Sequence, residues 1–220
     1  MAKTIEWQGI RRDSPYQAGA TALLLVDMQR IWVEPGLGAG KPPGVAEYYY
    51  HRLDTLVVPN QVRLLEAARA AGAEVIHTII RSHTSDGRDR SLDHKLSDIH
   101  IHPDAPEGDV IDALRPLPDE IVLPKTSSGV FNSTNLHYLL RNLGVRFLIV
   151  AGIVTDQCVD MAVRDGADLG YLVTCVDDAC ATYTQARHDA ALGAFAGYCW
   201  TADTATVAGR LRQLPPRTAA

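Results

Sequence analysis

Long apolar runs alternate along the chain with segments in which apolar residues recur every three or four positions. The run Thr21–Val26 contains no charged residue, as is typical of a strand that is buried on both faces of a sheet. Residues 60–71 have apolar side chains at helical spacing, which predicts a helix that begins after Pro59 and ends at Gly72. By the same criteria, we expect further strands at 74–80, 120–123, 147–153, 171–176 and 200–201, and further helices at 136–143, 156–167, 184–198 and after the last strand.

Strands that alternate with helices predict a parallel sheet with helices on both faces. We therefore expect an α/β fold, a three-layer α-β-α, Rossmann-like arrangement with a mostly parallel sheet. It would form a single domain over residues 1–220 with its core at about 20–205. The long stretches 32–47 and 82–109 are expected to be functional or mobile loops, and the tail after residue 214 is expected to be disordered.

The composition is that of an ordinary globular protein, because 46% of the 220 residues are apolar and 21% are charged. The net charge of −5 comes without a basic cluster, so nucleic acid is not expected as a partner. No apolar run approaches the roughly 18 residues that cross a bilayer, and the amino-terminal segment lacks the apolar core of a signal peptide. We therefore expect no membrane association and a cytoplasmic location.

The residues that could take part in catalysis lie where the predicted strands end. The carboxyl ends of parallel strands share one edge of the sheet, so Asp27, Lys125, Cys158 and residues 81–83 are all expected there. Cys158 stands at the start of a predicted helix, where unpaired N–H groups and the helix dipole favour the thiolate, which is the nucleophilic form. Asp27 would take the thiol proton, and Lys125 would hold both groups ionisable near neutral pH.

Each of these side chains also has an ordinary structural interpretation. A cysteine after a strand can simply pack in the core, an aspartate can cap the following turn, and a lysine can face solvent. Cys175, Cys180 and Cys199 lie in or beside apolar segments and are interpreted as small core residues. The residue pattern by itself leaves both interpretations of the three candidate positions open.

Three segments together resemble the signature segments of the isochorismatase-like cysteine hydrolases. They are residues 24–29 (LLVDMQ), residues 124–136 (PKxxSxxFxxTxL) and residues 152–159 (GIVTDQCV). They occur in the expected order and spacing, and the resemblance covers roughly residues 20–205. Any one segment would be a weak signal, whereas the set of three is specific.

The resemblance implies that Asp27, Lys125 and Cys158 form a catalytic triad. It also implies a non-proline cis peptide bond between Ile153 and Val154. Such a bond would aim the N–H groups of Val154 and Cys158 at one point, where they would form an oxyanion hole.

Members of the family that these segments resemble differ in their nucleophile. Members that cleave vinyl ethers, such as isochorismatase itself, lack the cysteine, whereas amidases such as N-carbamoylsarcosine amidase and the ureide hydrolases have it. Cys158 therefore implies hydrolysis of a C–N bond in a small amide, carbamoyl or ureide compound through a covalent acyl- or carbamoyl-enzyme, with release of ammonia or a small amine. Because family members are often dimers or tetramers, a homo-oligomer is expected.

Neither a cofactor nor a metal is expected. The nicotinamidases of the family hold a metal with an Asp-x-His pair after the second strand, but here Arg81 stands two residues before His83. His94, His100 and His102 follow in a polar segment and are expected to be solvated rather than ligating.

Aromatic and polar residues near the same edge are candidates for contacts with the substrate. The residues expected to touch it are Trp32, Phe131, Val154, Thr155, His83 and Arg81. The tyrosine run 48–50 is interpreted as packing. The glycine-rich segment 36–41 lacks the spacing of a phosphate-binding loop and is not followed by Ser or Thr, so nucleotide binding is not expected.

Three other functions stay open on the same fold. Cleavage of an enol ether is disfavoured by Cys158, and a thiol-transfer role is disfavoured by the lack of a second cysteine at short spacing. A non-catalytic binding protein is the third. The residue pattern does not distinguish carbamoyl compounds, linear ureides and simple carboxamides as substrates.

Overall fold

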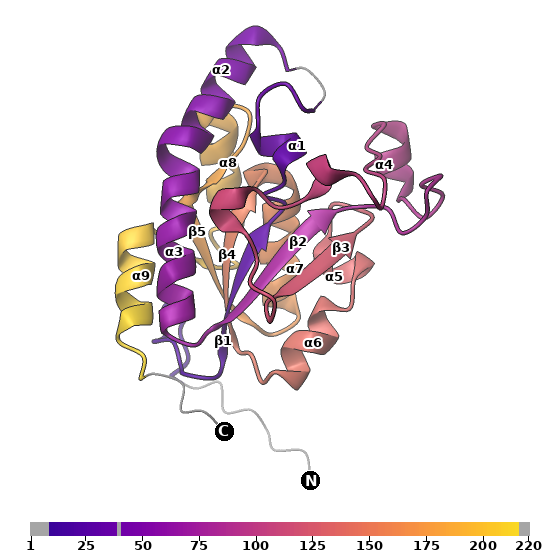
Figure 1. The fold of residues 1–220 in the computed structure, drawn as a ribbon. Coiled ribbons are helices and arrows are strands. Elements are labelled where there is room, and N and C mark those ends of the chain that lie inside the picture. The colour runs from indigo at the N-terminus through magenta and orange to yellow at the C-terminus, as the bar shows by residue number, and fades with distance from the viewer. Residues whose placement is uncertain (1–8, 39–40, 216–220) are drawn as a thin grey trace.

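The computed structural model describes residues 9–38 and 41–215. In this part of the chain, six parallel strands form one sheet in the order β3-β2-β1-β4-β5-β6 (Figure 1). The strands are β1 (Thr21–Val26), β2 (Glu74–Ile80), β3 (Ile121–Lys125), β4 (Phe147–Ile153), β5 (Leu172–Ala181) and β6 (Trp200–Ala202). The expected α/β fold is confirmed. Of the tail that the sequence predicts to be disordered, residues 216–220 lie outside this description.

Helices cover both faces of the sheet. They are α1 (Arg30–Val33), α2 (Pro43–Arg52), α3 (Val58–Ala70), α4 (Leu92–Leu96), α5 (Val130–Ser133), α6 (Leu136–Asn142), α7 (Asp160–Asp168), α8 (Gln185–Phe195) and α9 (Thr204–Arg212), with π-helical turns η1 (Leu53–Val57) and η4 (Thr155–Val159) and 3-10 turns η2 (Pro106–Gly108) and η3 (Asp112–Leu114). In Figure 1, α3 and α9 lie along one face, and α6 and α7 lie along the other. Among the described residues, no helix combines the length and the apolar character that crossing a membrane requires.

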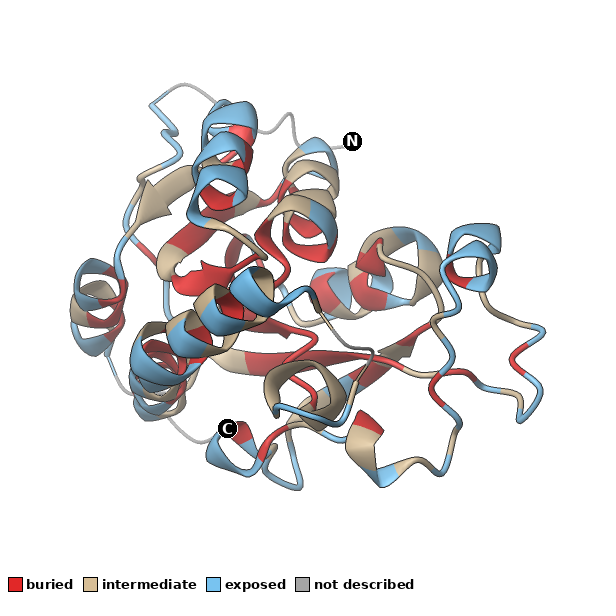
Figure 2. Ribbon diagram, turned by 90° about the horizontal axis from the view of Figure 1, so that it is seen from above, coloured by how far each residue is buried: buried red, intermediate tan, exposed pale blue. Residues whose placement is uncertain are grey.

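The central strand β1 is buried on both faces, as its apolar run predicts. Leu23 and Leu25 belong to the core beneath α3 and α9, whereas Leu24 and Val26 belong to the core beneath α6 and α7. Successive side chains of a strand point to opposite faces, so a strand between two helical layers needs apolar residues at every position. Figure 2 shows the buried residues along the strands and on the inward faces of the helices.

The helix predicted to begin after Pro59 begins much earlier, and this prediction is wrong. The chain is helical from Pro43 to Ala70, because the π-helical turn η1 joins α2 to α3. Proline lacks an N–H donor and normally interrupts a helix. Here the Val58 N–H donates to the Leu53 carbonyl, five residues back, and the wider turn lets the helix continue through Pro59. The expected loops 32–47 and 82–109 likewise contain helical turns.

The carboxyl end of β4 approaches β1 closely at a glycine. Gly152 has φ +137°, and a Cβ atom there would lie 2.3 Å from the Val26 carbonyl oxygen and 2.6 Å from its nitrogen. Any other residue would therefore push β4 away from β1 just before Asp27. The glycine keeps the two strand ends, which carry Asp27 and the turn to Cys158, side by side.

Candidate active site

Three side chains from three strand ends meet at the switch point of the sheet, where the strand order reverses between β1 and β4. The Lys125 Nζ lies 2.8 Å from the Asp27 Oδ2 and 3.4 Å from the Cys158 Sγ. All three residues are buried. Strand β3 is separated from β1 by β2, so only a side chain as long as lysine spans the distance from its end to the other two. The edge predicted from the sequence thus brings Asp27, Lys125 and Cys158 into contact.

Asp27 is held in an unusual backbone conformation at the end of β1. Its φ is +56°, a left-handed value that few residues other than glycine adopt, and such conformations concentrate at functional sites. The Thr78 hydroxyl donates to the Asp27 Oδ1 at 2.8 Å, and the Asp27 N–H donates to the Thr78 carbonyl at 3.1 Å. The Oδ2 forms the ion pair with Lys125 and accepts no hydrogen bond from any other described residue. This oxygen is therefore available to receive a proton.

Lys125 remains charged although it is fully buried. Burial opposes the charge, but the Asp27 carboxylate and the Cys158 sulfur beside it outweigh burial and raise the pKa of the ammonium group. The Nζ also donates to the carbonyls of Ser127 at 2.9 Å and Ser128 at 3.2 Å. The site therefore contains a permanent positive charge that is aimed at both the carboxylate and the sulfur.

The Cys158 thiol is less acidic than the sequence predicts. Burial and the Asp27 carboxylate raise its pKa to about 12, and Lys125 only partly opposes them. The start of helical turn η4 was expected to favour the thiolate, but removal of the sulfur from water beside a carboxylate has the larger effect. The resting site at neutral pH therefore holds a neutral thiol beside the ion pair of Asp27 and Lys125.

A narrow cavity of about 60 Å³ opens at the sulfur. Two of the predicted substrate contacts, Trp32 and Val154, line it. Besides Asp27 and Cys158, the cavity is lined by residues that the sequence does not single out, which are Lys41, Tyr49, Ile80, Ile99, Ile153, Gln157 and Tyr183. Tyr49 had been interpreted as packing; it is buried and forms a wall of the cavity as well. The Ile153–Val154 peptide bond is cis, as the resemblance implies.

Four other predicted contacts are not among the residues that line this cavity. Phe131 stacks on Tyr171 with ring centroids 6.0 Å apart, so it belongs to the core beneath α7. Arg81 forms an ion pair with Asp109 at 2.7 Å, and His83 is exposed. The Thr155 hydroxyl forms a hydrogen bond with His188 of α8. Phe131, Thr155, His83 and Arg81 are thus not among the residues that line the cavity, and their contact with a substrate stays a prediction.

The histidines of the segment after β2 differ in how far they are buried. His94 is buried near the three side chains, and its pKa is lowered by burial and then by the charge of Lys125. His100 and His102 are exposed. The described residues contain no group of three or more His, Cys, Asp or Glu side chains arranged to hold a metal ion. That the protein uses no metal stays a prediction.

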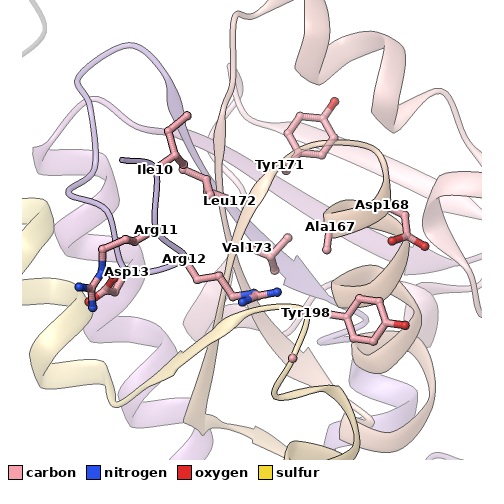
Figure 3. Close-up of a pocket in the computed structure, with 11 residues that line it drawn as sticks. Ile10, Arg11, Arg12, Asp13, Ala167, Asp168, Tyr171, Leu172, Val173 and Tyr198 are labelled. Carbon is pink, nitrogen blue, oxygen red and sulfur yellow. Dashed lines mark hydrogen bonds and ion pairs between the residues drawn. The ribbon is translucent and has the colours of Figure 1, made fainter. Parts of the chain in front are cut away.

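A larger pocket of about 780 Å³ lies at the opposite end of the sheet, where β5 begins (Figure 3). Its lining includes Arg12, which extends toward Val173 and Tyr198 in Figure 3. Neither a cysteine nor a histidine is among the described residues that line it. Because the pocket lacks a nucleophile and lies at the amino ends of the strands, the cavity at Cys158 is the candidate active site.

A buried histidine supports the turn that carries Cys158. The His188 Nδ1 lies 2.9 Å from the Thr155 Oγ1, and its Nε2 lies 3.1 Å from an Arg52 nitrogen. Arginine can only donate, so the Nε2 accepts and the Nδ1 carries the proton that Thr155 accepts. Burial and then Arg52 lower the pKa of His188 to about 4, which keeps the ring neutral. Turn η4 is thus tied to α2 and α8.

Because two histidines are buried in their neutral form, we expect the protein to lose stability in acid. Burial lowers the pKa of both His77 and His188 to about 4, so both stay neutral in the folded protein while the unfolded chain takes up protons below about pH 6.5. The contribution of these neutral histidines to the free energy of unfolding is complete above pH 6.5. It is lost as the pH falls toward 4, by about 3 kcal/mol for each histidine. We expect urea denaturation to show a lower free energy of unfolding at pH 4.5 than at pH 7.

Substitution of His77 separates this effect from other acid-sensitive groups. H77Q should show a smaller loss of stability between pH 7 and pH 4.5 than the wild-type protein. H51Q, which changes an exposed histidine, should behave as the wild type. Equal losses in the wild-type protein and H77Q would show that His77 does not contribute.

Known proteins are similar to this chain in sequence and in fold. A family model described as "Isochorismatase domain" matches residues 21–207. A probable inactive nicotinamidase of Arabidopsis thaliana is 34% identical over an alignment of 177 positions that covers 77% of this chain and 85% of that protein. The ureidoacrylate amidohydrolase RutB of Caulobacter segnis is 29% identical over an alignment of 229 positions that covers 93% of this chain and 91% of that protein. The crystal structure of a cysteine hydrolase from Pseudomonas syringae pv. phaseolicola is similar with a TM-score of 0.79 at 29% identity, covering 91% of this chain and 96% of that one.

Proposed function

Because the chain belongs to the isochorismatase family, we propose that it is a cysteine-dependent hydrolase of a C–N bond in a small amide, carbamoyl or ureide compound. The observation that carries the proposal is the contact of one buried lysine with both a carboxylate and a thiol, at 2.8 Å and 3.4 Å, beside a cavity. A nucleophile, a base and a fixed positive charge are the parts that covalent hydrolysis of an amide needs.

In the proposed reaction, the scissile carbonyl enters the cavity beside Cys158. As the sulfur forms its bond to the carbonyl carbon, the thiol proton passes to Asp27, which is the base. Because the resting thiol is protonated, this transfer accompanies the attack rather than preceding it. Lys125 stays charged and stabilises the negative charge, which moves from the carboxylate to the sulfur and the substrate oxygen.

The remaining steps use the same groups. The N–H groups of Val154 and Cys158 donate to the oxyanion, and loss of one such donor typically costs about 100-fold or more in rate. Protonated Asp27 then gives its proton to the leaving nitrogen, the C–N bond breaks, and ammonia or an amine departs. Water attacks the thioester or thiocarbamate with Asp27 as the base. The C–S bond breaks, and the proton returns to the sulfur.

Support for the substrate class comes from the site and from one relative. The relative named ureidoacrylate amidohydrolase acts, by that name, on a ureido compound, and the match covers 93% of this chain. The cavity of about 60 Å³ restricts the reactive end of a substrate to a small group such as a carboxamide or ureido group. Assembly into a dimer or tetramer and a cytoplasmic location stay expectations from the sequence.

A screen for release of ammonia tests the proposed reaction. Purified protein is incubated with a panel of primary carboxamides, linear ureides and N-carbamoyl amino acids, and ammonia is measured with a coupled enzyme. At least one ureide or carbamoyl compound should be hydrolysed, and the variant C158A should not hydrolyse it.

The same screen distinguishes the competing functions. A panel without turnover would favour a non-catalytic protein, as the name of the Arabidopsis relative says of that protein. Cleavage of an enol ether by C158A at the wild-type rate would overturn the covalent mechanism.

A further inference from the structure

The cavity at Cys158 contains a second lysine that the proposed reaction does not use. Lys41 lies just before α2 and lines the cavity with Asp27 and Cys158. Its Nζ lies over the rings of Tyr49, Tyr50 and Tyr183, at 4.8, 5.1 and 5.9 Å from the ring centroids. It also lies 3.4 Å from the Tyr50 hydroxyl oxygen. We name these three rings the tyrosine cage.

The tyrosine cage holds the ammonium group in position without neutralising it. Tyr49 is buried, and its ring packs against both neighbours, with centroids 5.3 Å from Tyr50 and 5.4 Å from Tyr183. The pKa values of Tyr49 and Tyr183 are raised, chiefly by burial, so both rings are neutral phenols at physiological pH. The rings attract the cation through their π faces, but they supply no negative charge.

Lys41 has no carboxylate partner within 4.0 Å among the described residues. The contrast with Arg187 is informative, because Arg187 lies over the same Tyr183 ring but is paired with Asp156. Within the cavity, Asp27 is already neutralised by Lys125 at 2.8 Å. With Cys158 as a neutral thiol, the described residues that line the cavity therefore leave one uncompensated positive charge, on Lys41.

We propose that Lys41 and the tyrosine cage form an anion-binding subsite that receives a carboxylate of the substrate. This inference deepens the proposed function: the substrate class becomes a ureido or N-carbamoyl carboxylic acid rather than a neutral amide. One uncompensated positive charge beside the cavity matches an anion of single charge, and a carboxylate is the smallest common organic one. A positioned cation that has already lost part of its hydration forms a strong charge-assisted hydrogen bond with it.

A matched pair of substrates tests this subsite. 3-Ureidopropionate and its methyl ester have the same ureido group, and only the acid carries a charge. The wild-type protein should hydrolyse the acid with the higher kcat/KM. In K41M the ratio of kcat/KM for acid over ester should fall roughly 10- to 100-fold, the range expected when a hydrogen bond to a charged group is lost.

Two further variants control for the change of side chain. K41R keeps the charge and the contact with the rings, so most of the ratio should return. K95M removes an exposed lysine of α4 that lies outside the cavity, and its ratio should equal that of the wild type. An acid-to-ester ratio near one in the wild-type protein, or the same ratio in K41M as in the wild type, would overturn the subsite.

A binding measurement separates failure of the subsite from failure of the proposed reaction. Propionate and propionamide are titrated into wild-type protein and K41M by calorimetry, which needs no turnover. Propionate should bind the wild type more tightly than propionamide does, and K41M should lose this preference. If no compound is hydrolysed but this preference is found, the subsite stands and the hydrolase proposal fails. If propionate shows no preference in the wild type, the subsite is wrong even if ureides are hydrolysed.

Discussion

Replacement of Cys158 by alanine is expected to reduce hydrolysis by roughly 10⁴-fold or more while the protein stays folded. Alanine cannot form the covalent intermediate, and Asp27 and Lys125 are then left with no nucleophile beside them. The change removes one small buried atom, so the cavity cost is modest and the ion pair between Asp27 and Lys125 is intact. Release of ammonia measures the activity, and thermal denaturation followed by circular dichroism measures the folded state.

Cys199 offers the matched control for this experiment. It is also a buried free thiol, but it lies in the core beneath α8 rather than at the cavity. C199A should lose a similar amount of stability and should keep its activity. Hydrolysis by C158A at the wild-type rate would mean that the thiol forms no covalent intermediate.

Replacement of Lys125 by methionine is expected to have the largest effect on stability. The lysine is fully buried, and its removal leaves the Asp27 carboxylate buried without its partner. Breaking a buried pair from one side costs about 3–5 kcal/mol of the free energy of unfolding. Activity should also be lost, because no fixed charge then stabilises the sulfur and the oxyanion. Urea denaturation at pH 7 measures the stability.

A double-mutant cycle shows whether the lost charge is the cause. D27N alone leaves Lys125 as the unpaired buried charge, and it should also be destabilised. The double variant D27N/K125M has no buried charge and should recover most of the loss, while staying inactive. The carbonyls of Ser127 and Ser128 lose their donor both in K125M and in the double variant, so this effect cancels in the cycle. Additive losses in the double variant would show that the two charges are not coupled.

The neutral state of the thiol changes what the three side chains must do. A thiolate that existed before binding would need only a substrate, whereas a thiol with a pKa of about 12 needs a base at the moment of attack. The Asp27 Oδ2, which accepts no hydrogen bond from another described residue, is the atom placed to receive the proton. This arrangement keeps the sulfur unreactive until a carbonyl group is positioned beside it.

The turn that carries the sulfur depends on residues far along the chain. Thr155 is tied through His188 to Arg52, which itself donates to the Cys180 carbonyl at the end of β5. Asp156 accepts from Thr182 and is paired with Arg187 of α8. These contacts hold the backbone of the turn between two helices and a strand, so the N–H groups proposed for the oxyanion hole are positioned before a substrate binds.

The sequence by itself determined the central strands of the sheet and the edge at which the candidate catalytic residues meet. Strands β1, β2 and β4 have the bounds that their largely apolar runs predict, because a strand that is buried on both faces carries apolar residues at most of its positions. Parallel strands end at one edge, so the chain positions of Asp27, Lys125 and Cys158 were enough to expect that they meet.

Only the tertiary structure decided how these groups behave and what surrounds them. The direction of the Cys158 pKa depends on burial and on the charge of Asp27, which is 131 positions away in the chain but adjacent in space. Lys41 reaches the cavity because α2 packs its tyrosines against Tyr183, and the irregular segment before α2 has no periodicity that reports this contact. Periodicity records whether a position is buried; which side chains share a cavity, and which charges remain unpaired there, follows from how distant segments pack.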